Sequence, residues 1–84
     1  MSAILQGSIE DRVRKILAEQ FCIEPSEIDL SADIGDKYGA DSLAQLELVM
    51  DIEDEFEIEV PDEDMLAMKT GQQIVDYVTA KVRP

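Results

Sequence analysis

Asp41 and Ser42 are the residues whose types and position most clearly suggest chemistry. They follow a glycine at position 39 and directly precede an amphipathic segment. Aspartate is a preferred N-cap residue, because its carboxylate accepts a hydrogen bond from a backbone N–H group of the first helical turn. Ser42 would then lie in that first turn, where free N–H groups and the helix dipole favour negative charge. A phosphodiester on the Ser42 hydroxyl would suit this position.

Catalysis by Ser42 itself is disfavoured by the composition. A serine nucleophile needs a base to activate it, and the chain contains no histidine. A Ser–Lys arrangement is the remaining alternative, with Lys37 as the only lysine close to Ser42 in the sequence. Cys22, the only cysteine, has no histidine partner either, so it is interpreted as a small apolar residue buried at the end of the first helix. No catalytic residue is assigned.

Three aspartates near the serine, Asp33, Asp36 and Asp41, raise the question of calcium. An EF-hand needs oxygen ligands at alternate positions, a central glycine and a bidentate glutamate that closes the loop. The spacing in this chain does not match that pattern. No metal site is therefore expected.

Four segments have the apolar spacing and the end signals of helices. The first begins at Ser8, where Ser-Ile-Glu-Asp resembles a capping box. The second covers about Ser42 to Phe56. A short third helix begins with Pro61 at its first position and acidic residues in its first turn, and the last begins at Thr70 with a Thr-x-x-Gln capping box. Between the first two helices, residues 25–36 are predicted to form a long loop.

These segments predict an all-α fold, a small antiparallel bundle of three longer helices plus one short helix. Residues 1–84 are expected to form a single domain, with residues 1–7 as a flexible lead-in. The predicted core lies at the apolar positions of the three longer helices and at three anchors in the loop. These positions are Ile9, Val13, Ile16, Leu17, Phe21, Ile28, Leu30, Ile34, Leu48, Val49, Ile52, Phe56, Ile74, Val75, Val78 and Val82.

The formal net charge of −13 limits the possible partners. Eleven acidic residues and no Lys or Arg lie between Tyr38 and Met68. Nucleic acids and anionic membranes require basic patches, so neither is expected to bind, whereas a surface of one sign attracts partners with basic surfaces. The chain has no signal-peptide pattern and no segment near the roughly 20 apolar residues that span a bilayer, so an integral membrane protein is not expected. A single cysteine fits a reducing cytoplasm.

The predicted 42–56 helix has a second apolar stripe besides its core stripe. At about 100° per residue, Leu43, Leu46 and Met50 lie on a different side of the helix from the core positions. Acidic residues, among them Glu47 and Asp54, flank these three side chains. Either the second stripe is the edge of a broad buried face, a possibility that concerns Leu46 most, or it is a docking surface beside Ser42.

The order of these motifs resembles that of the acyl carrier proteins of fatty acid and polyketide synthesis. The resemblance rests on Gly39-Ala40-Asp41-Ser42-Leu43, Glu47-Leu48-Val49-Met50 and Glu55-Phe56-Glu57-Ile58-Glu59-Val60-Pro61-Asp62-Glu63. In that family the serine of an Asp-Ser-Leu motif carries a 4′-phosphopantetheine arm, whose thiol holds acyl groups as thioesters. The resemblance implies that Ser42 is the attachment residue, that Asp41 and Leu43 belong to the cofactor site, and that the protein is a carrier and not an enzyme.

The resemblance also implies partners. A phosphopantetheinyl transferase (a holo-carrier synthase) would attach the arm from coenzyme A. Acyl-loading enzymes, ketosynthases or acyltransferases of fatty acid, polyketide or lipid biosynthesis would then dock their basic surfaces on the second helix. The residues implied for this docking face are Leu43, Glu47, Met50, Glu53 and Asp54. The carrier is expected to be a monomer.

An acyl pocket is expected around Phe56, Met65 and Met68. Flexible thioether side chains would suit a pocket that adapts to acyl chains of different length, and gap filling in an ordinary core is the alternative interpretation of the two methionines. Gly71, in the last helix, stands where a β-branched residue is frequent in the family.

Two residues before the motif also depart from the family pattern, because Lys37 replaces a common acid and Tyr38 a common leucine. These departures predict a specialised carrier with its own partners and cargo. Two other functions stay open, namely a peptidyl or aminoacyl carrier on the same fold and an acidic interaction module that never receives the arm. The dense acid along the second helix favours acyl cargo.

Overall fold

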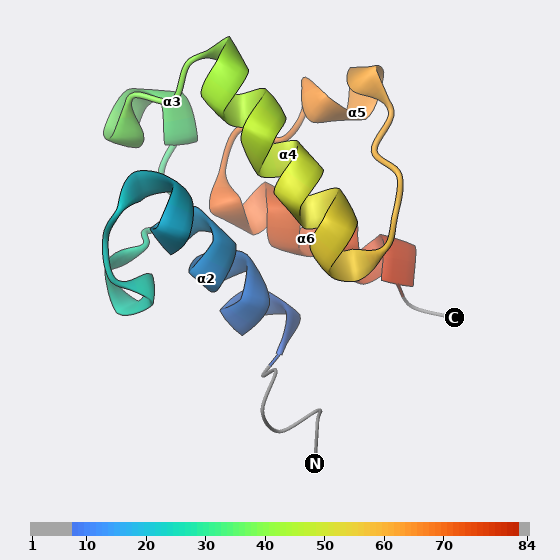
Figure 1. Cartoon of the computed structure of the whole chain (residues 1–84), viewed down its shortest axis with the longest axis horizontal. Coiled ribbons are helices and arrows are strands. Elements are labelled where there is room, and N and C mark those ends of the chain that lie inside the picture. The colour runs from blue at the N-terminus through green and yellow to red at the C-terminus, as the bar shows by residue number, and fades with distance from the viewer. Residues whose placement is uncertain (1–7, 83–84) are drawn as a thin grey trace.

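The computed structural model describes residues 8–82 and contains three longer helices that pack around one core (Figure 1). The predicted lead-in at residues 1–7 lies outside the described residues. The longer helices are α2 (Ile9–Phe21), α4 (Ser42–Phe56) and α6 (Gly71–Val82). The shorter elements are the 3₁₀ turn η1 (Pro25–Glu27), α3 (Ile34–Tyr38) and α5 (Asp62–Met65). The predicted all-α bundle is confirmed, and α2 and α4 run in opposite directions with α6 passing behind α4.

The predicted starts of α2 and α6 are confirmed by the hydrogen bonds of their caps. Ser8 Oγ accepts a hydrogen bond from the Asp11 N–H at 3.1 Å. At the start of α6, Thr70 Oγ1 accepts from the Gln73 N–H at 3.1 Å, and Gln73 Oε1 accepts from the Thr70 N–H at 3.0 Å. Each of these bonds satisfies a donor that the helix itself leaves unpaired.

The hydrophobic core draws on all three longer helices and on the loop before α3. The predicted loop anchors, Ile28, Leu30 and Ile34, are buried, as are the predicted core positions Val13, Ile16, Leu17, Leu48, Val49, Ile52, Phe56, Ile74, Val75 and Val78. Ile9 and Phe21 are partly buried against this core. The prediction was wrong for Val82, which is 40% exposed in the last turn of α6, where no later turn of the described helix covers it.

Cys22 was also predicted wrongly, because its side chain is exposed. The residue is the C-cap of α2 and adopts the left-handed conformation, with φ 60°. In this conformation its N–H bonds back to the Ala18 carbonyl, while the chain turns out of the helical path. The helix ends at Phe21, one residue before Cys22, so helical periodicity no longer places the thiol in the core.

The predicted loop at residues 25–36 is partly helical. Residues 25–27 form η1, and α3 begins at Ile34, where the Asp33 carboxylate accepts a hydrogen bond from the Asp36 N–H at 3.0 Å. A side chain of α2 fixes the loop, since Arg14 Nη1 donates to the carbonyls of Pro25 and Ile28 at 3.3 and 2.8 Å. The bundle therefore has two short α-helices within the described residues, not the one that was predicted.

The short helix α5 begins and ends differently from the prediction. Pro61 is its N-cap and not its first helical residue, and the helix ends at Met65, so that Leu66 is its C-cap. Leu66 and the buried Met68 therefore lie outside the helix, in the turn that leads to α6. No helix among residues 8–82 is long and apolar enough to cross a membrane.

Candidate functional site

Ser42 is the first residue of α4, and its side chain is exposed. Asp41 is the N-cap as predicted, and its Oδ1 accepts a hydrogen bond from the Ala44 N–H at 2.9 Å. The Asp41 carbonyl accepts the Gln45 N–H, also at 2.9 Å. The N–H groups of Ser42 and Leu43 precede the first intrahelical bond, so they point out of the helix end without an acceptor inside it. The serine hydroxyl thus lies at the positive end of a helix of fifteen residues.

The turn that presents Ser42 depends on Gly39. This glycine is the C-cap of α3 and has φ 69°, a conformation that costs other residues free energy. Its N–H bonds to the Gly35 carbonyl at 3.0 Å, which closes α3 only three residues before α4 begins. The chain therefore passes from α3 to α4 in a short, defined turn (Figure 1), and Ser42 is the first helical residue after it.

The donor set at this turn suits a phosphodiester on Ser42. The exposed hydroxyl is accessible to another protein, and the helix end provides backbone N–H groups for phosphate oxygens.

The nearest lysine in the sequence, Lys37, pairs with Asp29 at 3.5 Å, and Tyr38 accepts a hydrogen bond from the Asp29 N–H at 2.9 Å. Lys37 and Tyr38 therefore both contact Asp29 in the loop before α3.

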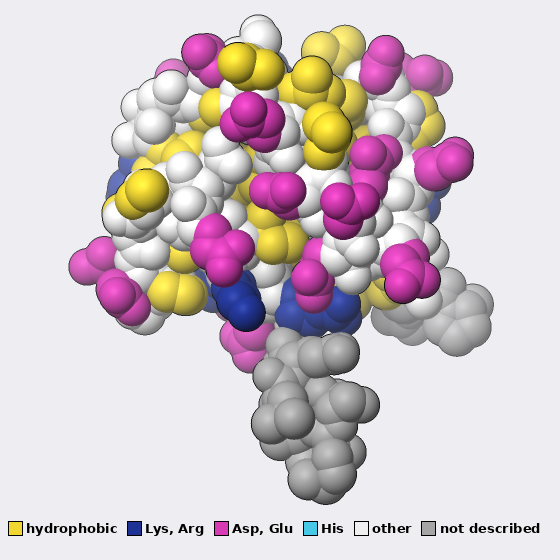
Figure 2. All heavy atoms as spheres, viewed as in Figure 1, with side chains coloured by type: hydrophobic (Ala, Val, Ile, Leu, Met, Phe, Trp, Pro, Cys, Tyr) yellow, Lys and Arg dark blue, Asp and Glu magenta, His cyan; other side chains and the backbone are white. Residues whose placement is uncertain are grey.

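An exposed apolar stripe lies on α4 beside Ser42. Leu43 is 64% exposed, Leu46 43% and Met50 54%, whereas the core stripe of the same helix is buried. Leu66 at the end of α5, which was not predicted to belong to this surface, is 76% exposed. Figure 2 shows hydrophobic side chains gathered over the start of α4 and over α5, with acidic side chains around them and basic ones away from them.

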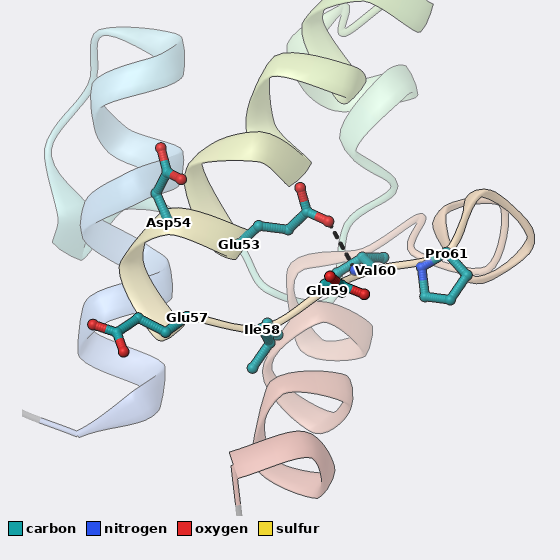
Figure 3. Close-up of a pocket in the computed structure, with 7 residues that line it drawn as sticks. All are labelled: Glu53, Asp54, Glu57, Ile58, Glu59, Val60 and Pro61. Carbon is teal, nitrogen blue, oxygen red and sulfur yellow. Dashed lines mark hydrogen bonds between the residues drawn. The ribbon is translucent and has the colours of Figure 1, made fainter.

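The acidic residues predicted for the docking face differ in their availability. Glu47 and Asp54 are exposed, and Glu47 Oε1 accepts only a long bond from Gln20 Nε2 at 3.4 Å. Glu53 is partly buried, and its Oε2 accepts the Val60 N–H at 2.8 Å (Figure 3). Glu53 therefore fixes the connection between α4 and α5 within the protein itself.

Four carboxylates line an open hollow of about 650 Å³ next to this bond. They belong to Glu53, Asp54, Glu57 and Glu59, and Figure 3 shows Asp54 and Glu57 pointing away from Glu53. No group of three or more His, Cys, Asp or Glu side chains within residues 8–82 is arranged to hold a metal ion. The hollow is thus a strongly acidic surface with no arrangement of metal ligands.

Two of the three residues predicted for an acyl pocket, Phe56 and Met68, line different hollows. Phe56 is buried and lines a surface hollow near the end of α4 with Ile9, Arg12 and Val82. Met68 is buried and lines two other hollows, one next to α4 and one next to α6, while Met65 is partly buried against the core.

Gln45 is a residue near Ser42 that sequence reasoning missed. It lies one turn into α4, and its Nε2 donates to the carbonyls of Met65 and Met68 at 3.2 and 3.1 Å. On the other side of the same segment, Tyr77 donates its hydroxyl to Asp64 Oδ2 at 2.6 Å. Burial, followed by this bond to the Asp64 carboxylate, raises the pKa of Tyr77 to about 12. The only sequence signal for Gln45 was a polar residue within the core stripe of α4.

Fold and site together define a small helical carrier, and comparison with known proteins identifies its family. Residues 11–78 match the family model described as a phosphopantetheine attachment site, so the chain belongs to the family of phosphopantetheine-bearing carrier domains, which are not enzymes. An acyl carrier protein from Enterococcus faecalis is 35% identical and superposes with a TM-score of 0.74. The match covers 86% of this chain and 91% of that protein.

Proposed function

We propose that this protein carries acyl groups for fatty acid, polyketide or lipid biosynthesis, on a 4′-phosphopantetheine arm attached to Ser42. The observation that supports the proposal best is an exposed serine hydroxyl at the start of a helix of fifteen residues, capped by Asp41 and flanked by an exposed apolar stripe. The arm supplies a thiol, on which the acyl group is held as a thioester, so the chain itself provides position and recognition.

Each residue of the attachment turn has a part in this proposal. Asp41 fixes the first residue of α4 and leaves the Ser42 hydroxyl in solvent, where a transferase can place it against coenzyme A. The N–H groups of Ser42 and Leu43 favour the negative charge of the phosphodiester once it is formed. The Leu43 side chain, at the same helix end, gives a transferase an apolar contact beside the serine.

Partner enzymes are proposed to bind the stripe that runs from the serine down α4. Leu43 and Met50 are exposed apolar contacts, and Glu47 and Asp54 are exposed carboxylates for Arg or Lys of the partner. Glu53 belongs to the same face but would act mainly by holding the α4–α5 connection through Val60. Partners of this kind include phosphopantetheinyl transferases, acyl-loading enzymes, ketosynthases and acyltransferases with basic surfaces.

Acyl cargo is favoured over aminoacyl or peptidyl cargo by the acidic docking face and by the likeness to an acyl carrier protein. We further propose that Met65, Met68 and Phe56 contribute apolar surface to an acyl chain, with the buried Met68 lining a hollow that Gln45 of α4 also lines. The interior would have to open to admit the chain, because Phe56 and Met68 line different hollows.

The test is the intact mass after incubation with coenzyme A, Mg²⁺ and a broad-specificity phosphopantetheinyl transferase. We expect a gain of one phosphopantetheine unit in the wild-type protein and no gain in Ser42→Ala. Offering the modified protein to acyl-loading and aminoacyl-loading enzymes then separates the two kinds of cargo. No gain with several transferases would contradict the carrier function and leave an unmodified interaction module.

A further inference from the structure

The segment from α5 to the start of α6 is attached to the bundle by hydrogen bonds and by the packing of Met65 and Met68. None of the four residues of α5 is buried, and Leu66 and Ala67 after it are exposed. Met68 is the one side chain of the segment 62–68 in the buried core. The bonds from Gln45 to two carbonyls of this segment, and from Tyr77 to Asp64, hold it on its two sides.

Gln45 stands between Ser42 and the interior. It follows the serine by three residues, so both lie on neighbouring positions of the helix surface. Gln45 and Met68 line a hollow of about 240 Å³ together with residues of α3 and the turn before α6, namely Asp33, Ile34, Gly35 and Lys69. Met68 also lines the second hollow, of about 400 Å³, which Tyr77 lines from α6. A single methionine side chain thus borders both spaces.

We propose that Gln45 is a specificity-determining residue, whose amide holds the Met65–Met68 segment against α4 and so restricts cargo entry from the Ser42 side into the space behind Met68. This inference rests on the proposed carrier function and names what selects the cargo. Cargo that is short stays outside the bundle. A long alkyl chain enters only when the two bonds from Gln45 are broken and the Met68 thioether changes its rotamer.

Gln45 selects against long cargo because an alkyl chain cannot replace the hydrogen bond that Gln45 donates to a backbone carbonyl. The Met65 carbonyl also accepts the Met68 N–H, at 3.1 Å, so it keeps a partner when Gln45 moves away. The Met68 carbonyl has Gln45 as its donor at 3.1 Å, and covering it with a hydrocarbon would leave it without a hydrogen bond. A substitution that removes the Gln45 amide lowers the free-energy cost of chain entry, because the 65–68 segment is then no longer bonded to Gln45 of α4.

The experiment uses the full chain with the arm attached and loaded with either an acetyl or an octanoyl group. The variant Gln45→Met removes both donors and keeps the side-chain length, and Gln45→Ala provides a second variant with a high helix propensity. The matched control is Gln72→Met, the same substitution at an exposed glutamine whose side chain bonds only Asp76 on its own helix. The readouts are the rate of thioester cleavage by hydroxylamine and the methyl NMR shift of Met68.

We expect the cleavage rate of the octanoyl form relative to the acetyl form to fall about tenfold in Gln45→Met, a factor that corresponds to about 1.4 kcal/mol. The Met68 methyl shift should then depend on chain length more strongly in both Gln45 variants than in the wild-type protein or in Gln72→Met. Equal rate ratios and equal shifts in all proteins, with the arm verified on Ser42 by mass, would overturn the role of Gln45 alone. Absence of the arm from the wild-type protein would overturn the carrier function and this inference with it.

Discussion

The guanidinium of Arg12 lies over the ring of Phe56, with its central carbon 4.4 Å from the ring centroid. The same side chain donates from Nε to Glu55 Oε2 at 2.8 Å and from Nη2 to the Glu55 carbonyl at 3.1 Å. The last turn of α4 contains no basic residue of its own. Arg12 of α2 therefore provides the positive charge that the carboxyl end of α4 favours, and it fixes the end of α4 that lies farthest from Ser42.

Replacing Arg12 by methionine should lower the free energy of unfolding by about 1–2 kcal/mol, because a partly exposed cation–π contact and a hydrogen bond to a carbonyl are lost together. The ion pair with Glu55 adds little, since that carboxylate is 41% exposed. Urea unfolding followed by circular dichroism measures the change. The control is Lys15→Met on the exposed side of α2, and equal losses in both variants would contradict a specific role for Arg12.

Asp41 should fix the geometry of the attachment turn mainly by the hydrogen bond that its side chain accepts from the Ala44 N–H. Its negative charge should matter less. Asp41→Ala removes the acceptor of the Ala44 N–H and should cost about 1 kcal/mol of stability, whereas Asp41→Asn keeps an acceptor and should cost little. If Ser42 is the attachment residue, the rate of modification by a transferase should follow the same order, with the alanine variant slowest. Similar stability and rates for both variants would show that the cap does not position the serine.

Local signals were enough to predict the starts of the three longer helices. Ser8, Asp41 and Thr70 each cap a helix through a bond to a backbone N–H three residues ahead, so the information lies within one turn of sequence. The exposed stripe of α4 was predictable for the same reason, because the angle between Met50 and the core positions depends only on helical geometry.

Two of the features that sequence reasoning missed depend on contacts between distant residues, and one depends on a local helix end. The loop before α3 is fixed by Arg14 of α2, whose side chain reaches carbonyls at positions 25 and 28. Gln45 finds its acceptors 20 and 23 residues later, in a segment that carries no local pattern pointing back to it. Cys22 was misplaced because the left-handed C-cap turns its side chain away from the stripe that the helix would have continued.

Gly71 and Leu30 should form a matched pair. A Cβ atom at Gly71 would lie 2.6 Å from Leu30 Cδ2 and 3.2 Å from Leu17 Cδ1, so the Leu30 side chain occupies the space that a side chain at position 71 would need. Gly71→Val should therefore destabilise the protein by about 1–3 kcal/mol through overpacking. Leu30→Ala leaves a cavity in an otherwise intact core and should also destabilise.

The double variant distinguishes a matched pair from two separate defects. Combining Gly71→Val with Leu30→Ala should cost less than the sum of the single changes, because the valine then occupies space that the leucine has left. Urea unfolding of the four proteins completes the cycle. Additive losses would show that the two residues do not share the space.

Tyr77, which bonds α6 to Asp64 of α5, should make the free energy of unfolding depend on pH in the alkaline range. Burial and the bond to Asp64 raise its pKa to about 12, against about 10 for an unfolded chain. Between these values the unfolded state has lost the phenolic proton while the folded state still holds it, so the free energy of unfolding falls as the pH rises. The stabilisation by Tyr77 is thus complete below pH about 10 and is lost on the way to about 12.

Tyr77→Phe isolates this contribution, since it removes the hydroxyl and its titration but keeps the ring. The variant should be less stable than the wild-type protein at neutral pH, and the difference between the two should shrink above pH about 10, where only the wild-type protein loses stability through this group. Urea unfolding of both proteins at several pH values gives the difference, and an NMR titration of the Tyr77 ring gives the pKa directly. A difference that stays constant up to the highest pH would mean that the hydroxyl of Tyr77 does not keep its proton through the bond to Asp64.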